Sequence, residues 1–350
     1  MTMKYRFLVL TGAFILVAAL ALVSLVAQAP AEKNAAKTNG ATSWTPPRTP
    51  WGDPDLQGIW NATWRTPTQR PRRGEPAVVT DEEDAAEAID ELVKGYDAPL
   101  KQGDVGTYNA FWREWGTVLK GRTELIVDSP DGRIPPMTKE AQAREARYPR
   151  QRGEGGGGGD RDSNTRGPED RSLRERCLSW DAQPYTGHGG FPRIVQAPGY
   201  VVITILRIHE ARIIPLDGRP HLPKSVQQLN GDQRGHWEGD TLVVETTNFT
   251  DKKSYDGARE NLTLLERFTR VDPNTINYEV TITDPTTWVR PWKMAFPFRN
   301  AAREFGPDGA EAGITEYACH EGNHALTGAL SGARADDKAG LTKKSASNAR

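Results

Sequence analysis

A chain of 350 residues is long enough for one large domain or two smaller ones. Its 45 lysines and arginines almost balance its 46 aspartates and glutamates, and no segment is strongly basic, which argues against a nucleic-acid-binding surface. The 34 glycines, 25 prolines and 10 tryptophans favour strands joined by frequent turns over long helices.

Residues 1–29 have the pattern of an export signal. Lys4 and Arg6 precede an apolar run over residues 7–26, and the last three residues of the segment, Ala-Gln-Ala, fit a signal-peptidase site, with Ala29-Pro30-Ala31 as a rival site. The apolar run is also as long as a membrane span, so an uncleaved anchor in the inner membrane is the alternative to cleavage. In either case the sequence predicts an exported protein, periplasmic or secreted, whose residues 30–50 form a polar, proline-rich tether.

After the tether we expect a single β-rich domain over residues 51–334. A turn at residues 53–55 leads into Gly58-x-Trp60, which opens a short strand. A more helical insertion over residues 80–176 follows. In it we expect a helix over 81–94 with a capping box at Thr80-x-x-Glu83, an amphipathic helix near 111–115, an apolar strand over 125–127, a helix from Thr138 to Ala146 and a glycine-rich surface loop over 153–167.

The second half of the chain is predicted to contain consecutive strands without helices between them. Apolar, β-branched runs bounded by Gly, Pro, Asn and Asp recur along it. The predicted strands cover residues 193–196, 200–208, 211–215, 241–247, 262–271, 276–283, 288–298 and 314–319. The predicted fold is therefore mainly β, an antiparallel meander closed into a barrel or folded into a sandwich, with a few short helices in the N-terminal half. From Ser331 the sequence is small and polar, and we expect a disordered tail that includes residues 335–350.

The chain has two cysteines, Cys177 and Cys319. Outside the cytoplasm a disulfide persists, and an even count fits a single bridge. Closing so long a loop would stabilise the fold by about 4–5 kcal/mol in the chain-entropy account. The alternative is two buried free thiols.

Six stretches of the chain form a recognisable set. They are DPDLQGIW, DGRIPPMT, RIHEARIIPLDGRPHLP, GHWEGDTLVVETTNF, LLERFTRVDPNTINYEVTITDPTTWVRPW and YACHEGNHAL. Together they resemble an abundant family of exported bacterial proteins that is common in soil bacteria, and the resemblance spans residues 50–334. It implies export and a shared fold and assigns no catalytic residue. The Gly58-x-Trp60 start, followed by antiparallel hairpins, is also similar to a lipocalin, which implies a lipocalin-like barrel.

Residues 320–324 spell H-E-x-x-H, the zinc-binding pattern of metallopeptidases. In those enzymes the motif lies on a helix, where both histidines bind the metal and the glutamate activates a water. Here Gly322 and Asn323 disfavour a helix, and no histidine or glutamate follows His324 to supply a third ligand. We therefore expect a strand end and a turn beside Cys319 in place of a zinc-binding helix.

A looser metal site is a second hypothesis, because all six histidines fall between His188 and His324. His209 ends a predicted strand, His236 precedes a hairpin and His320 follows a strand. If these ends meet at one mouth of the barrel, the three histidines could bind zinc or another divalent ion and leave a position for water. The alternative for each is a surface or hydrogen-bonding histidine.

Two carboxylates lie in apolar rows of predicted strands. Alternation places Glu266 on one face with Leu264 and Phe268, and Asp284 closes the apolar row of the following strand. Burial raises the pKa of a glutamate, which suits it to general acid or base catalysis near neutral pH. Alternatively, Arg212 compensates Glu266 in a structural ion pair inside the barrel.

The aromatic residues of the second half allow either a ligand cavity or an ordinary core. Trp237, Tyr278, Trp288 and Trp292 could line an apolar cavity and, with Arg212, bind a ligand. Large aromatic side chains also dominate most protein cores by area, which is the alternative for each of them.

Two functional hypotheses follow. The first is an exported barrel that binds a small, mainly apolar or aromatic molecule, with Glu266, Asp284, Arg212 and His209 orienting its polar atoms and with no metal required. The second is an enzyme on the same barrel, in which Glu266, Asp284 and His209, with or without a divalent ion, perform lyase, isomerase or hydrolase chemistry. A zinc peptidase is the less favoured form of this enzyme. Neither G-x-S-x-G nor a phosphate loop ending in Lys-Ser/Thr occurs, which argues against a common serine hydrolase or nucleotide enzyme.

Overall fold

The computed structural model describes residues 44–73, 78–99, 116–147, 167–170, 173, 175–179, 185, 191–205, 208, 210–251, 255–301, 318–321 and 323–340. The chain divides into two units, Met1–Trp44 and Thr45–Arg350, and every helix and strand named below belongs to the second unit. The predicted signal segment, the helix near 111–115 and nearly all of the glycine-rich loop lie outside the described residues.

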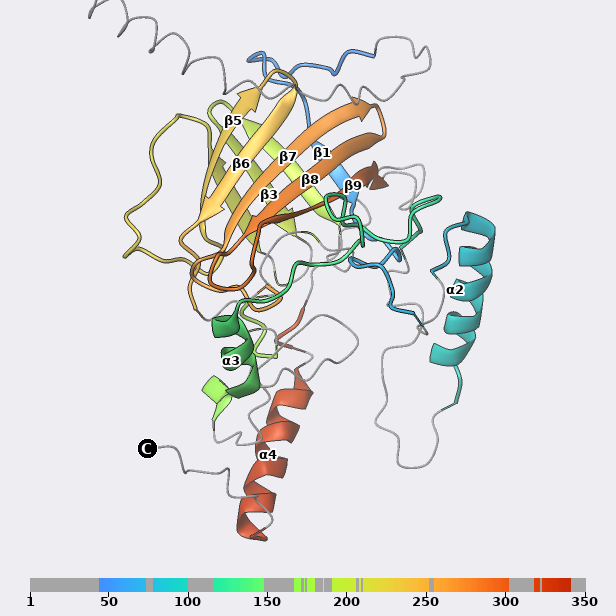
Figure 1. Cartoon of the computed structure of the whole chain (residues 1–350), viewed down its shortest axis with the longest axis vertical. Helices are drawn as coiled ribbons and strands as arrows, with labels where there is room; N and C mark the ends of the chain where they lie inside the picture. The colour runs from blue at the N-terminus through green and yellow to red at the C-terminus, as the bar shows by residue number, and fades with distance from the viewer. Residues whose placement is uncertain are drawn as a thin grey trace, which may run out of the picture. The chain divides into compact units, whose positions relative to one another are not determined.

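In the described chain, nine strands form one antiparallel sheet that is nearly closed into a barrel (Figure 1). They are β1 (Gly58–Asn61), β2 (Pro192–Ala197), β3 (Tyr200–Ile205), β4 (Ala211–Pro215), β5 (Asp232–Glu238), β6 (Thr241–Thr247), β7 (Thr263–Asp272), β8 (Thr275–Thr283) and β9 (Trp292–Asn300). Their order in the sheet is β4-β3-β2-β1-β9-β8-β7-β6-β5. The predicted mainly-β meander is confirmed, and of the two predicted closures the barrel is the one formed.

The two edge strands of the sheet, β4 and β5, meet by side-chain packing. They are not hydrogen-bonded neighbours in the described sheet, yet Gly235 of β5 lies against Ile214 of β4. A Cβ atom at position 235 would lie 2.7 Å from Ile214 Cγ2 and 2.8 Å from Leu216 Cδ2, closer than carbon atoms pack. Glycine at this position therefore lets the edges approach, and their contact covers edges that would otherwise be exposed.

Most strand predictions are confirmed. β4 and β6 have the predicted bounds, and β2, β7 and β8 differ from them by one residue at one or both ends. β9 begins at Trp292 instead of residue 288, because the N–H groups of Thr287 and Trp288 donate to the Asp284 carbonyl and form a turn. The prediction missed β5, whose sequence DQRGHWE is polar and contains a glycine.

Three other strand predictions differ from the structure. β3 ends at Ile205, before Ile208, which has a φ of 57° that no regular strand tolerates. The predicted strand at residues 125–127 is reduced to one bridge between Ile126 and Met294. Of the strand predicted at 314–319, only residues 318 and 319 are described, and neither is in a strand.

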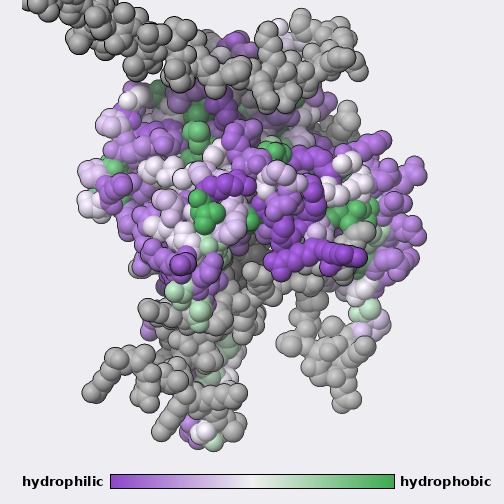
Figure 2. All heavy atoms as spheres, viewed as in Figure 1, coloured by the Kyte–Doolittle hydropathy of each residue, from purple (hydrophilic) through white to green (hydrophobic). Residues whose placement is uncertain are grey.

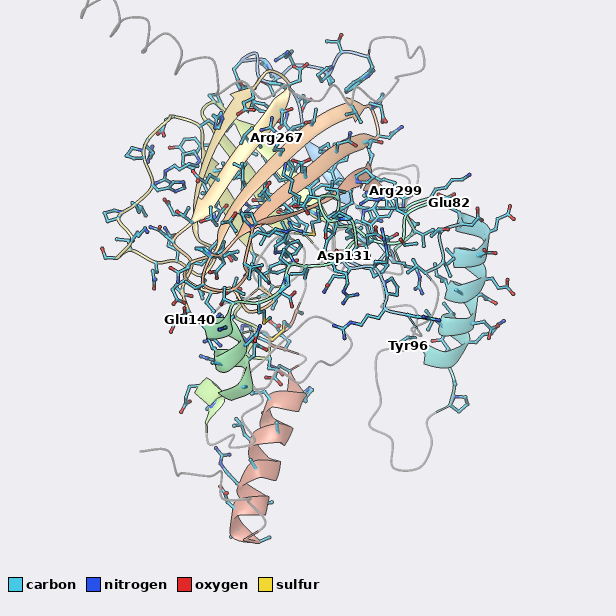
Figure 3. All side chains as sticks on the ribbon, viewed as in Figure 1. Glu82, Tyr96, Asp131, Glu140, Arg267 and Arg299 are labelled. Carbon is cyan, nitrogen blue, oxygen red and sulfur yellow. A yellow bond between two sulfur atoms is a disulfide. The ribbon has the colours of Figure 1, made fainter. Side chains whose placement is uncertain are left out.

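Alternation along the strands separates the barrel interior from its outer face. On β7, Leu264, Glu266 and Phe268 are buried, as their spacing predicts. Arg267, between them, lies on the outer face, where it donates to Glu238 at 2.7 Å (Figure 3). The interior is filled by side chains from all parts of the sheet, including Trp60, Ile194, Val201, Ile203, Ile214, Val244, Tyr278, Val280, Ile282, Trp292, Met294, Phe296 and Phe298.

Two helices in the N-terminal half match their predictions closely. α2 (Glu82–Tyr96), whose end residues are labelled in Figure 3, is capped by Asp81, whose carboxylate accepts the Glu83 N–H at 2.9 Å. The predicted cap was Thr80, one residue earlier. α3 (Lys139–Arg147) starts as predicted, since Thr138 Oγ1 accepts the Ala141 N–H at 3.1 Å. A short 3₁₀ helix, η2, covers Pro168–Asp170. Within the described chain, no helix is both long and apolar enough to cross a membrane.

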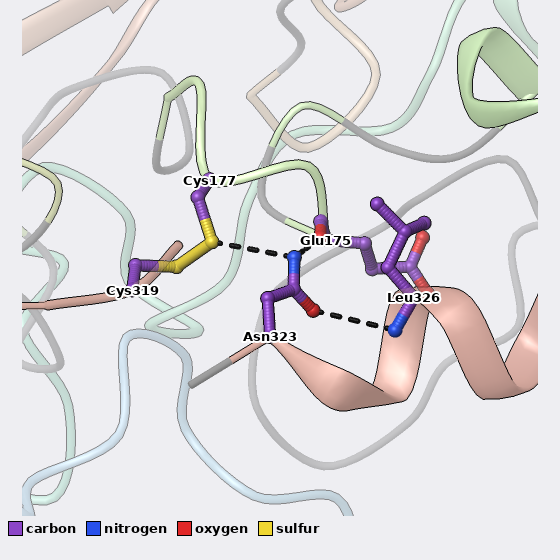
Figure 4. The surroundings of a disulfide bond; sticks show 5 residues. All are labelled: Glu175, Cys177, Cys319, Asn323 and Leu326. Carbon is purple, nitrogen blue, oxygen red and sulfur yellow. Dashed lines mark hydrogen bonds between the residues drawn. A yellow bond between two sulfur atoms is a disulfide. The ribbon is translucent and has the colours of Figure 1, made fainter. Parts of the chain in front are cut away.

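A third helix, α4 (His324–Lys338), corrects the expectation of a disordered tail from residue 331. Its N-cap is Asn323, whose Oδ1 accepts the Leu326 N–H at 3.3 Å (Figure 4). The Asn323 amide also donates to the Glu175 carbonyl at 2.7 Å. The cap therefore stabilises the first turn of the helix and ties it to the segment around residue 175.

The predicted disulfide between Cys177 and Cys319 is formed, with 5.8 Å between the two Cα atoms (Figure 4). Asn323 Nδ2 lies 3.5 Å from Cys177 Sγ, so the bridge and the start of α4 form one contact region. A disulfide that closes 142 residues of sequence separation is typical of an oxidising compartment.

The outer surface is polar where it is seen in Figure 2. On that face, hydrophobic residues are single and scattered among hydrophilic ones. Most of the large apolar side chains of the described chain are buried in the core.

Candidate functional site

An ion pair lies fully inside the barrel. The side chains of Arg212 on β4 and Glu266 on β7 are 1% and 0% exposed. The guanidinium binds the carboxylate through two bonds: Nη1 donates to Oε1 at 3.0 Å, and Nη2 donates to Oε2. The ion pair that the sequence suggested between these residues is thus present, and its two-pronged geometry is the strong form of such a contact.

Two further side chains from the sheet belong to this cluster. Tyr278 of β8 donates its hydroxyl to Glu266 Oε1 at 2.9 Å, and Arg212 Nη2 donates to Thr246 Oγ1 at 3.3 Å. Burial raises the pKa of Tyr278 well above its ordinary value, and the negative charge of Glu266 adds to this effect. Burial alone would lower the pKa of Arg212, but the charge of Glu266 and the phenol of Tyr185 raise it overall. Arg212 is therefore charged and Tyr278 neutral at physiological pH.

Tyr185 is the residue of the cluster that does not come from the sheet. It precedes β2, is 4% exposed, and its ring contacts Tyr278 and Phe298 edge-on with centroid distances of 5.7 and 5.4 Å. Its ring centre lies 5.8 Å from the guanidinium carbon of Arg212, and its hydroxyl accepts from Arg212 Nη1 at 3.5 Å. Burial raises the pKa of Tyr185 to about 12. A neutral phenol from outside the sheet therefore lies inside the barrel.

The sequence gives little signal for Tyr185. Residues 180–184 and 186–190 on either side of it are not described, and its surroundings, DAQPYTGHGG, have neither helical nor strand periodicity. Tyr185 lies between Pro184 and Thr186, and a large aromatic residue in such a segment does not by itself distinguish a buried ring from an exposed one.

The arrangement suits recognition of a polar aromatic molecule. Aromatic rings supply an apolar wall, and a charged donor and a carboxylate acceptor lie within that wall. Glu266 accepts bonds from both Arg212 nitrogens and from Tyr278. A carboxylate with three donors is better suited to holding the guanidinium in one orientation than to removing a proton from a substrate.

Asp284 follows the end of β8 and is 3% exposed. Its Oδ1 accepts from the N–H and hydroxyl of Thr286 at 2.9 and 2.7 Å, and its Oδ2 accepts from the Thr287 hydroxyl at 2.9 Å. These bonds stabilise the β8–β9 turn. The carboxylate also borders a small hollow outside the barrel core, and no hydrogen bond or ion pair joins it to Glu266 in the described chain.

The predicted ligand-binding tryptophans lie in or beside the core. Trp288 and Trp292 are buried and pack edge-on with centroids 5.6 Å apart, and Tyr255 stacks on Trp292 at 6.1 Å. Trp237 is half-buried near the end of β5. Among the described residues, none of the three indole N–H groups has a hydrogen-bond acceptor, and each such group costs about 1–3 kcal/mol.

The described histidines do not come together at one site. His209 lies outside it. His236 is on the outer face of β5, 60% exposed, with Nε2 at 3.2 Å from Glu238 Oε1. His320 is exposed in the turn that precedes α4, and His324 is the first residue of that helix, so the two histidines of H-E-x-x-H do not share one helical face. No three His, Cys, Asp or Glu side chains of the described residues come close enough to hold a metal ion together.

Of four side chains predicted for the site, three lie together and one does not. Arg212, Glu266 and Tyr278 form one cluster, and Asp284 stands apart from them at the end of β8. No protein-family model matches the chain, and no curated protein matches it.

Proposed function

We propose that the protein is an exported barrel that binds a small, neutral phenol in its interior, in the space that the Tyr185 side chain occupies in this structure. Tyr185 is the observation that carries the proposal. A phenol ring lies edge-on to Tyr278 and Phe298, with its hydroxyl turned to the buried guanidinium of Arg212. The chain's own side chain thus illustrates the size, shape and polarity that the interior accepts.

The contacts of Tyr185 favour its exchange for a ligand. Its hydroxyl lies 3.5 Å from Arg212 Nη1, at the long limit of a hydrogen bond. The hydroxyl of Tyr278, in contrast, lies 2.9 Å from Glu266 Oε1. A free phenol is not tethered to the backbone and can approach Arg212 to the normal distance, so it would gain a bond that Tyr185 makes only weakly.

Charge compensation within the cluster favours a neutral ligand over an anionic one. Glu266 already balances the charge of Arg212 through two bonds. A ligand carboxylate would add a second negative charge beside Glu266 in a low-dielectric interior, which is unfavourable. A neutral hydroxyl can accept from Arg212 without this penalty.

The energetics of the ion pair support a role in recognition. A buried ion pair contributes little net stability compared with well-packed apolar residues, because both charges lose their hydration. Two aromatic residues of the core, Tyr185 and Tyr278, contact the pair. A charged donor held in a fixed orientation inside an apolar barrel is what selective binding of a polar aromatic molecule requires.

Export is part of the proposal. The signal-like segment at residues 1–29, the resemblance to exported bacterial proteins and the Cys177–Cys319 disulfide all support it. Intact-mass measurement of the protein from the periplasmic or secreted fraction tests it. A mature chain that begins at residue 30, or at residue 32 for the rival site, is expected if the signal is cleaved, and the full mass is expected if it is retained as an anchor.

Binding is tested by calorimetry with p-cresol, which has the same atoms as a tyrosine side chain, and with toluene, which lacks the hydroxyl. The wild-type protein is expected to bind p-cresol with a Kd in the micromolar to millimolar range. Tyr185→Gly, which removes the ring, is expected to bind it at least tenfold more tightly, since an aromatic-sized cavity in a core accepts an aromatic guest. Toluene is expected to bind Tyr185→Gly at least tenfold more weakly than p-cresol, because it leaves Arg212 without the bond.

Tyr255→Gly is the matched control. It also deletes a tyrosine ring, partly buried beside the core, but Tyr255 stacks on Trp292 and makes no bond to Arg212 or Glu266 in the described chain. It is expected to show no preference for p-cresol over toluene. Binding of p-cresol by Tyr185→Gly alone, with none by the wild type at millimolar concentration, would mean that the substitution made the site and that the proposed function is wrong.

A further inference from the structure

A hollow lined by charged and polar side chains lies outside the barrel core. It has a volume of about 180 Å³ and lies where the β6–β7 and β8–β9 connections meet α3. Arg144 of α3, Asp251, Arg259 and Glu260 of the first connection, and Asp284 and Thr286 of the second line it. This volume is below the range of about 300–1,000 Å³ that drug-sized ligands need, so only a small molecule fits.

Two of the lining side chains are held firmly by the fold. Arg144 Nη2 donates to the Gly257 carbonyl at 3.2 Å and to the Thr287 hydroxyl at 3.0 Å. Asp284 is 3% exposed and accepts from Thr286 and Thr287. One positive and one negative group are therefore fixed in the wall of the hollow and need no reordering when a ligand binds.

Other charged groups of the hollow have no partner in the described chain. The side chains of Arg259, Glu260 and Asp251 form no hydrogen bond or ion pair with any described residue, although they border the same small space. Elsewhere neighbouring opposite charges do pair, as Arg70 and Glu124 do at 2.5 Å. A positively charged donor and negatively charged acceptors thus remain available to a bound molecule.

We propose that this hollow binds a small zwitterion, a molecule that carries an ammonium and a carboxylate group a few bonds apart. Among the described residues, the lining has two positive and three negative side chains. A simple anion would be repelled by three carboxylates, and a simple cation would be repelled by two guanidinium groups. A zwitterion can place its carboxylate beside the guanidinium groups and its ammonium group beside the carboxylates. The two arginines would bind the carboxylate, and Asp251, Glu260 and Asp284 the ammonium.

The polarity of the lining also restricts the part of the ligand that lies between or beside its two charged groups. Every described side chain that borders the hollow is charged or polar, so an apolar substituent would gain few apolar contacts there. Free amino acids with short polar side chains have the right charges and size. This site does not depend on the phenol site, since none of its lining residues contacts Arg212, Glu266 or Tyr185 in the described chain.

The test is calorimetric titration of the full-length exported protein with L-glutamine and two analogues that each lack one charge. 4-Aminobutanamide is glutamine without its carboxylate, and glutaramic acid is glutamine without its ammonium group. Glutamine is expected to bind at least tenfold more tightly than either analogue. Arg259→Gln and Glu260→Gln are each expected to weaken glutamine binding at least tenfold.

Arg267→Gln is the matched control, because it removes an arginine from the outer face of β7, away from the hollow. Its glutamine affinity is expected to equal that of the wild type. Equal affinity for glutamine and glutaramic acid would instead indicate an anion site and overturn the proposal. Absence of glutamine binding at millimolar concentration, with all variants folded by circular dichroism, would overturn it as well.

Discussion

The buried ion pair gives the sharpest prediction about the barrel interior. In Glu266→Gln the shape of the side chain is kept while its charge is lost. Oε1 accepts from Arg212 Nη1 and from Tyr278, and Oε2 accepts from Arg212 Nη2. An amide has one oxygen, so its NH₂ group must replace one of these acceptors and face a donor. Arg212 is then left charged and under-compensated in the core.

The expected loss follows from the burial of both groups. With side chains 1% and 0% exposed, solvent cannot replace the missing contact. Breaking such a pair from one side typically costs about 3–5 kcal/mol, a large part of the ~5–15 kcal/mol that stabilises an ordinary domain. Replacing both partners by apolar residues, as in Arg212→Met with Glu266→Leu, is expected to recover much of this loss, because no charge then remains buried.

Equilibrium unfolding in urea, with the disulfide intact and tryptophan fluorescence as the signal, measures these differences. Glu279→Gln is the matched control on β8. It removes a carboxylate that pairs with Lys293 at 3.2 Å while 39% exposed, so a loss of about 0–1 kcal/mol is expected. A loss for Glu266→Gln no larger than that of Glu279→Gln would refute the reasoning about the buried pair.

Three further predictions concern the contact between the barrel edges, the Cys177–Cys319 disulfide and the ionisation of Tyr185. Gly235→Ala is expected to lower the free energy of unfolding by about 1–3 kcal/mol, since its Cβ would overlap Ile214; an unchanged urea midpoint would contradict the tight contact between the barrel edges. Replacing Cys177 and Cys319 together by alanine is expected to cost about 2–5 kcal/mol in the same assay, and a cost near zero would show that the bridge adds no constraint. Tyr185 should ionise near pH 12, above the ordinary value of 10.0. Its contribution to stability is therefore fully present below about pH 10 and is lost as the pH rises through 12; a phenolate absorbance titration in which Tyr185→Phe removes no late step would refute this.

The sheet shows which parts of the fold a period-two pattern can predict. β7 and β8 alternate clearly between apolar and polar residues, so their bounds and the inward direction of Glu266 follow from the sequence. β5 has no such pattern, because it lies at the edge of the sheet and uses Gly235 for contact with β4. Its formation depends on the partner strand β6, a tertiary effect that local propensity does not contain.

The site was predictable to the extent that its residues lie on regular strands. Arg212 and Glu266 could be paired from their strand positions. Tyr185 could not be placed, because its local sequence has no periodicity and its position depends on contacts with β8 and β9. Helix α4 was missed for a related reason: Gly and polar residues lower its helix propensity, and the cap at Asn323 is stabilised by a contact with residue 175, far away in the sequence.

The most direct test of the central claim is a crystal structure of the wild-type protein grown with p-cresol. We expect a p-cresol ring inside the barrel, edge-on to Tyr278 and Phe298, with its hydroxyl at hydrogen-bond distance from Arg212 and with the Tyr185 side chain displaced. A structure in which Tyr185 keeps its place between these residues, with p-cresol bound elsewhere or absent at a saturating concentration, would show that the barrel does not bind a phenol in this space.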